Sequence, residues 1–158
     1  MKFTRLHLTH EADICASAED AWDLLLDWAG LLRWWPEDAP FKIEQCDLVG
    51  EHGRVPRTRE VHPGGGLVVP ETLLVQDDEA KRIYYNMGQN PVINVRNYLA
   101  TTTVDATGPD TCHMIFSSHS DVDENTDPEP FKAGILTVYS TIESGFNRYF
   151  SARKKQLD

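Results

Sequence analysis

Cysteine is scarce in this chain, and its three copies follow no pattern. Cys15, Cys46 and Cys112 lie far apart, are odd in number and form no CxxC pair. Because a disulfide framework and a cysteine-based metal site both need regular spacings, the sequence argues against either. We therefore expect three free thiols that behave as small, partly buried hydrophobic side chains.

Long apolar runs and basic clusters are also missing. No hydrophobic stretch approaches the roughly 20 residues of a membrane-spanning helix, and the opening stretch MKFTRLHLTHEAD lacks the apolar core of a signal peptide. The formal net charge of -10 argues against nucleic acid, which is bound by clustered Lys and Arg side chains. These absences predict a cytoplasmic protein without nucleic-acid binding or membrane insertion, and they leave its oligomeric state open.

Motifs for metals and phosphate-bearing cofactors are equally hard to find. No group of His, Asp and Glu residues has a recognisable zinc spacing. The glycine-rich stretch HPGGGL joins two expected strands, whereas a phosphate loop would join a strand to a helix. The sequence thus predicts neither a metal nor a cofactor.

The composition is that of a globular protein, and its length suits a single domain over residues 1–158. Hydrophobic residues make up 41% of the chain and charged residues 25%. The alternation from Phe3 to Ala16 predicts a half-buried strand. Ser17 followed by Asp20 resembles a capping box and predicts a short helix. A second short helical piece, LLRWWP, ends at Pro36.

The middle of the chain reads as an antiparallel meander. Gly, Pro, Asn and Asp residues separate short runs that are rich in β-formers. The short connections indicate that neighbouring runs pair as hairpins. The expected strands are Phe41–Val49, Arg54–Val61, Leu67–Gln76, Lys81–Met87, Val95–Asp105 and Thr111–Val122.

The last segment predicts one long amphipathic helix. Asp127 is a good N-cap and Pro128 suits the first helical position. Apolar residues then recur at helical spacing, namely Phe131, Ile135, Val138, Ile142, Phe146 and Tyr149. A single long helix has to cover one face of a curved antiparallel sheet, so the fold class is α+β.

Charged residues share a face with apolar ones in the hairpin GRVPRTREVHPGGGLVVPETLLVQDD. By the period of two, Arg57 and Arg59 point the same way as Val55 and Val61, and Glu71 shares a face with Leu67, Val69, Leu73 and Val75. One register places Arg57 opposite Glu71, and a register slipped by one pair places Arg59 there. Either leaves a second inward arginine, which a filled or wet cavity tolerates better than a dry core. A solvent-exposed salt-bridge cluster is the alternative.

Several stretches resemble a known superfamily. They are ASAEDAWDLLLDWAGLLRWWP, GRVPRTREV, VVPETLLVQDDEAKRIYYNM and VRNYLATTTVDATGPDTCHMIFSSHSDVD. Together they are similar to the START, birch-pollen-allergen and polyketide cyclase/dehydrase superfamily, also called SRPBCC. The resemblance implies the helix-grip fold, in which a curved antiparallel sheet wraps around a long C-terminal helix. It also implies a ligand cavity between them, closed by the loops at His62–Gly66 and Gly88–Asn94.

Other candidates are placed by parity within this expected cavity. Tyr85 should face inward, Asn97 and Tyr98 cannot both do so, and of Trp34 and Trp35 one should cap the mouth while the other packs the core. Gly134 and Gly145 either leave room for a ligand or allow close packing. The remaining expected wall is Val69, Leu73, Met87, Phe116, Ile135, Val138 and Ile142.

Two functions remain open. The first is a cofactor-independent acid–base enzyme, such as a cyclase, dehydratase or isomerase, on a hydrophobic ring-bearing or polyketide-like molecule. In it Arg57 or Arg59 would polarise a carbonyl, and Glu71, Tyr85 or His10 would move the proton. His10 could equally be a hydrogen-bonded core residue. The second is a carrier of a hydrophobic small ligand, with no reaction.

Overall fold

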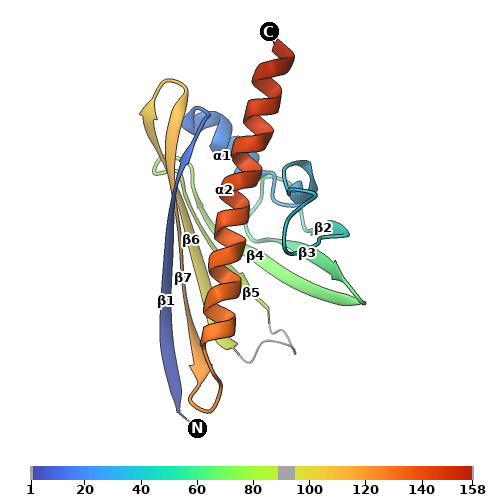
Figure 1. The fold of residues 1–158 in the computed structure, drawn as a ribbon, viewed down its shortest axis with the longest axis vertical. Coiled ribbons are helices and arrows are strands. Elements are labelled where there is room, and N and C mark those ends of the chain that lie inside the picture. The colour runs from blue at the N-terminus through green and yellow to red at the C-terminus, as the bar shows by residue number, and fades with distance from the viewer. Residues whose placement is uncertain (1, 89–94, 158) are drawn as a thin grey trace.

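A seven-stranded antiparallel sheet forms the body of the molecule (Figure 1). The computed structural model describes residues 2–88 and 95–157. The strand order is β1-β7-β6-β5-β4-β3-β2, so every strand after β2 pairs with its neighbour in the chain and β1 closes the far edge against β7. The strands are β1 (Phe3–Ile14), β2 (Gln45–Val49), β3 (Arg57–Gly64), β4 (Leu67–Asp77), β5 (Arg82–Met87), β6 (Val95–Gly108) and β7 (Thr111–Asp123).

Two short helices follow β1, as the sequence predicts. In α1 (Ala18–Leu26), the Ser17 hydroxyl caps the helix by accepting the Asp20 backbone N–H at 3.1 Å. The second piece, η1 (Leu31–Arg33), is a single turn of 3₁₀-helix. Both bury apolar side chains in the main core, among them Trp22 and Leu31.

The long helix α2 (Glu129–Leu157) lies across the sheet, and its last turns extend beyond the strands (Figure 1). Its start follows the predicted cap, because Asp127 Oδ1 accepts the Glu129 N–H at 3.0 Å. None of the helices in the described part of the chain combines the length and the apolar character that a bilayer crossing requires. The arrangement is the predicted helix-grip fold.

The glycine turn between β3 and β4 is tighter than the sequence indicates. β3 extends through Gly64, so only Gly65 and Gly66 separate it from β4. All three have positive φ angles, of 114°, 65° and 78°, a region in which a side chain would be strained. The expected closing loop at His62–Gly66 is therefore mostly strand, and most of the expected loop at Gly88–Asn94 lies outside the described residues.

The predicted inward-facing side chains of the hairpin are buried in its centre but not at its ends. Leu73 is fully buried, but Val55, Leu67 and Val75 are exposed, contrary to the sequence prediction. The pairing of β4 with β5 shifts register between Leu73 and Val75, and such a shift breaks the alternation of the two faces. Val55 lies before the start of β3, so strand parity does not govern it.

Candidate functional site

An apolar cavity of about 570 Å³ lies between α2 and the half of the sheet that carries β3 to β6. Ile135, Val138 and Ile142 of α2 form one wall, and Val69 and Met87 of the sheet form part of the other. These are five of the side chains predicted to line it. The volume is in the ordinary range for a small-molecule site, about 300–1,000 Å³.

Trp35 and Gly134 resolve two alternatives that the sequence leaves open. Trp35 lines the cavity and donates its indole N–H to the Phe41 carbonyl at 2.8 Å. Gly134 also lines it, and a Cβ built there would meet no atom within 4 Å. Gly134 thus leaves room beside the cavity.

Arg59 and Glu71 form an ion pair in the wall of this cavity, whose lining also includes the charged residues Lys42 and Asp127. They are register partners on β3 and β4, and Arg59 Nη2 lies 3.0 Å from Glu71 Oε2. Of the two pairings that the sequence allows, the structure therefore has the one with Arg59. The exposed fraction is 9% for the Arg59 side chain and 19% for that of Glu71, so the carboxylate is the more accessible partner.

Trp28 holds this pair from the core side. Its ring centroid lies 3.7 Å from the Arg59 guanidinium carbon, a cation–π contact, and its carbonyl accepts from Arg59 Nη1 at 3.3 Å. Its indole N–H donates to the Glu71 backbone carbonyl at 3.0 Å. Burial lowers the pKa of Arg59, but the Glu71 carboxylate and other neighbours outweigh this, so the net direction is upward.

Tyr85 and Tyr98 bring phenol groups to the same cavity. Both are buried and line it, so Tyr98 is the inward member of the pair Asn97 and Tyr98. Burial raises the pKa of both phenols well above their ordinary value, and each pKa is raised further by the Glu71 carboxylate. Both therefore stay protonated at neutral pH. Tyr139 of α2 is also buried, and its hydroxyl has no hydrogen-bond partner among the described residues.

Arg57 is buried but lies away from the cavity. Its guanidinium donates to the backbone carbonyls of Leu26 at 2.8 Å and Arg54 at 2.9 Å, and to Gln76 Oε1 at 3.1 Å. Leu26 ends α1, so Arg57 satisfies a helix-terminal carbonyl and ties α1 to the sheet. Burial lowers its pKa. The second inward arginine is thus held by carbonyl groups, and its predicted place at the cavity is wrong.

His10 faces inward from β1, as predicted, and also lies outside the cavity wall. Its Nε2 is 2.8 Å from Glu143 Oε2 on α2, and its ring stacks on Phe116. It joins strand and helix at a distance from Arg59 and Glu71. The structure therefore favours the reading of His10 as a hydrogen-bonded packing residue.

Four residues predicted to bind ligand belong to other parts of the fold. Leu73 and Phe116 are fully buried in the core, and Trp34 packs against Phe146 with ring centroids 4.8 Å apart. Asn97 points outward and donates to Asp121 Oδ2 at 2.9 Å. Strand parity selected Leu73 and Phe116 correctly as inward residues, but it cannot say how far along the strand the cavity extends.

Two buried aromatic residues behind this site were not predicted from the sequence. Tyr139 lies between Ile135 and Ile142 at helical spacing, so the same periodicity that selected those residues would have found it. Trp28 follows the end of α1, in a segment without a regular period. Its place beside Arg59 is set by tertiary packing.

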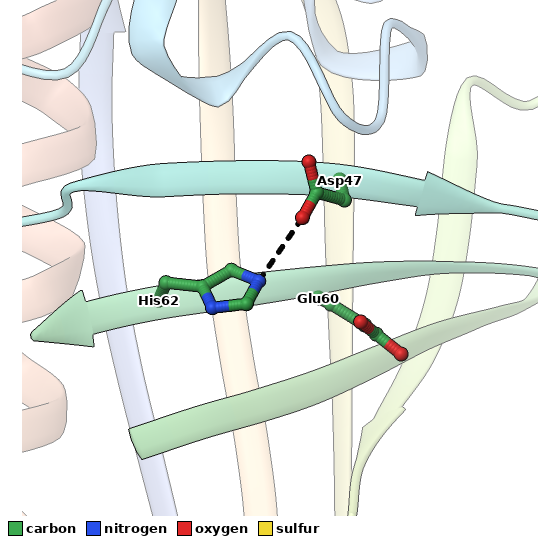
Figure 2. Close-up of side chains that lie close together, drawn as sticks. All are labelled: Asp47, Glu60 and His62. Atoms are coloured by element: carbon green, nitrogen blue, oxygen red, sulfur yellow. Dashed lines mark hydrogen bonds and ion pairs between the residues drawn. The ribbon is translucent and has the colours of Figure 1, made fainter. Parts of the chain in front are cut away.

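One cluster on the outer face of the sheet has donor atoms suited to a metal (Figure 2). Asp47, Glu60 and His62 offer ligand atoms within 4.8 Å of one another. Ligand atoms around a metal with bonds of about 2.1 Å lie roughly 3.4 Å apart, so this spread is too wide without rearrangement. Asp47 Oδ2 already accepts a hydrogen bond from the Gln45 side chain and is hydrogen-bonded to His62. We interpret the group as a surface hydrogen-bond cluster, and the absence of a metal remains a prediction.

Solved structures with this fold include norcoclaurine synthase from Thalictrum flavum. A point mutant in complex with a transition-state analogue has a TM-score of 0.69 and 20% identity, over 98% of this chain and 99% of that one. The enzyme in complex with dopamine and hydroxybenzaldehyde has a TM-score of 0.63 and 21% identity, over 89% of this chain and 86% of that one. At this identity, the likeness shows a shared fold.

XoxI from Bacillus cereus is similar over 94% of this chain and 97% of its own, with a TM-score of 0.75 and 23% identity. A comparison with curated proteins gives no match. A family model described as polyketide cyclase/dehydrase and lipid transport matches residues 5–150, which is nearly the whole chain. The strand order, the long helix and the cavity agree with that match, and the chain belongs to the polyketide cyclase/dehydrase and lipid transport family.

Proposed function

We propose that this protein is a cofactor-independent acid–base enzyme acting on a hydrophobic, ring-bearing small molecule. The observation that carries the proposal is the Arg59–Glu71 ion pair, which opens onto an apolar cavity beside two protonated phenols. A carboxylate in such a place takes a proton, and a phenol donates to a carbonyl or enolate oxygen. Arg57 and His10 lie elsewhere and have no part in the proposal.

The roles follow from which atoms reach the cavity. Glu71 is the more exposed partner and is the proposed proton acceptor. Tyr85, whose pKa is raised by burial and by Glu71, is the proposed hydrogen-bond donor to the substrate oxygen. Arg59 positions Glu71, because its guanidinium is held by Trp28 on the other side. The bound aromatic molecules of norcoclaurine synthase support a ring-bearing substrate by analogy of fold alone.

A carrier function is the second candidate, and the self-contained ion pair favours it. Arg59 and Glu71 are paired with one another without a ligand, so a guest could occupy the apolar part of the cavity and leave unchanged. The family description names lipid transport beside cyclase and dehydrase activity.

Hydrogen exchange separates the two functions. 2-Tetralone is a ring-bearing ketone with acidic C–H groups, and its exchange with D₂O is followed by ¹H NMR. The enzyme should accelerate exchange, and Glu71→Gln should lower the rate by about 10²- to 10⁴-fold, the usual contribution of a general base. Glu60→Gln is the matched control, because Glu60 neighbours Arg59 on β3 but lies on the opposite face. Binding of 2-tetralone without accelerated exchange would favour the carrier.

A further inference from the structure

The polar end of the cavity offers an incoming ligand a carboxylate as hydrogen-bond acceptor, whereas its guanidinium is already engaged by protein groups. Arg59 Nη2 is used by Glu71 and Nη1 by the Trp28 carbonyl, while the Trp28 ring covers the guanidinium face. Arg59 Nε has no hydrogen-bond partner among the described residues, but it is fully enclosed and beyond the reach of a ligand. A ligand anion would therefore have to compete with Glu71 for this arginine.

Glu71, unlike Arg59, has an oxygen atom that is free to accept a hydrogen bond from a ligand. Arg59 engages Oε2, and none of the described residues donates to Oε1. The side chain retains twice the exposed fraction of its partner, 19% against 9%, and it lines the cavity. Its surroundings are the protonated phenols of Tyr85 and Tyr98. The polar group that complements this set is a hydroxyl, which donates to the carboxylate and accepts from a phenol.

Charge balance favours neutral ligands over ionic ones. Arg59 and Glu71 together are neutral, and the other two charged side chains in the lining, Lys42 and Asp127, are of opposite sign. A charged ligand would therefore add an uncompensated ion to a largely apolar cavity. A ligand carboxylate would in addition meet the Glu71 carboxylate. A ligand ammonium would compete with Arg59 for Glu71 and lie beside its guanidinium.

Aromatic side chains form part of the cavity wall. Trp35, Tyr85, Tyr98 and Phe131 all line the cavity, and Tyr98 and Phe131 are arranged edge to face with centroids 6.5 Å apart. Such side chains favour stacked or edge-on contact with another ring. Building on the proposed function, we propose that the cavity selects an uncharged aromatic ligand whose hydroxyl donates a hydrogen bond to Glu71, over carboxylate or amine analogues of the same ring.

Four naphthalene probes of nearly equal size test this selection: 2-naphthol, 2-methoxynaphthalene, 2-naphthoate and 2-naphthylmethylammonium. Their dissociation constants are measured at pH 7 by NMR titration of the protein. 2-Naphthol should bind about tenfold to hundredfold more tightly than its methyl ether, which lacks only the donated hydrogen. Both ions should bind more weakly than 2-naphthol.

Glu71→Gln tests whether the carboxylate itself sets the ligand preference. With the carboxylate gone, Arg59 is left without its anion, so the preference should reverse and 2-naphthoate should bind more tightly than 2-naphthol. Glu60→Gln should keep the wild-type order. If Glu71→Gln does not fold, the order of the four probes on the wild-type protein still decides.

The outcomes distinguish this inference from the function on which it rests. A methyl ether that binds as tightly as 2-naphthol, or an ion that binds best, overturns the selection while leaving a hydrophobic ligand cavity in place. Binding of none of the four probes overturns the inference together with the proposed ring-bearing ligand. Exchange of 2-tetralone without the predicted probe order would support the enzyme and refute the selection.

Discussion

The Arg59–Glu71 pair allows a quantitative test of how dry the cavity is. We consider Arg59→Met, Glu71→Gln and the double variant. Breaking a fully buried pair costs about 3–5 kcal/mol, and an exposed pair contributes about 0–1 kcal/mol. The observed exposed fractions of 9% and 19% lie between these limits but nearer to burial. We therefore expect each single substitution to lower the free energy of unfolding by about 2–3 kcal/mol.

The double variant isolates the interaction itself. It leaves neither charge uncompensated, so it should cost less than the sum of the single substitutions, with a coupling energy of about 1–3 kcal/mol. Urea unfolding followed by far-UV circular dichroism measures all four proteins. Fluorescence is less suitable, because Trp28 contacts the substituted arginine. With a slope of about 2 kcal/mol/M, a change of 2 kcal/mol moves the midpoint by about 1 M.

A small coupling energy would refute this reasoning. If the coupling energy from this double-mutant cycle is less than about 0.5 kcal/mol, the pair is screened as on an open surface, and the cavity is filled with water. The expected preference for neutral ligands would then lose its physical basis as well, since it depends on poor solvation of an added charge. The loss from Arg59→Met includes its contact with Trp28, worth about 0.5–2 kcal/mol, which cancels in the cycle.

Three further predictions concern the scaffold. Gly145→Ala should lower the melting temperature, because a Cβ there would lie 2.5 Å from the Trp34 carbonyl oxygen. Gly134→Ala on the same helix introduces a Cβ that meets nothing within 4 Å, so it should raise stability by up to about 1 kcal/mol. Equal effects of the two substitutions in thermal unfolding would contradict this packing. Arg57→Met should destabilise by about 1–3 kcal/mol through the carbonyl groups it leaves unpaired and should leave 2-naphthol binding unchanged, so weaker binding in the NMR titration would place it in the site after all. Burial raises the pKa of Cys112 from 9.0 to about 11, so between these pH values the folded state keeps a proton that the unfolded state loses. The free energy of unfolding should therefore fall by about 2–3 kcal/mol as pH rises through that range. Urea unfolding at pH 8 and pH 11 should show a decrease that is smaller by this amount in Cys112→Ala.

The sequence alone determined the architecture, because local signals there agree with one another. Period-two alternation, glycine turns and the stripe on the last helix all predict one curved sheet under one long helix. The caps at Ser17 and Asp127 depend only on neighbouring backbone groups, and both are present. The inward placing of Arg59, Glu71 and Tyr85 also follows from parity within a single strand.

Tertiary structure decided everything that depends on a second element. Register is one such property: parity put Arg57 and Arg59 on the same face, but only the pairing of β3 with β4 set Arg59 against Glu71 and Arg57 against Leu73. The end of α1 then supplied the carbonyl that holds Arg57.

The extent of the cavity is another property that no local pattern encodes. The wall stops where the helices pack tightly on the sheet, which is why Trp34 packs and Trp35 lines, and why Gly145 is crowded while Gly134 is open. Trp28, which supports the ion pair from a segment without periodicity, could be found only once the chain had folded around it. Strand parity tells on which face of the sheet a side chain lies, but the packing of α2, α1 and η1 on that face decides whether it meets a ligand or the core.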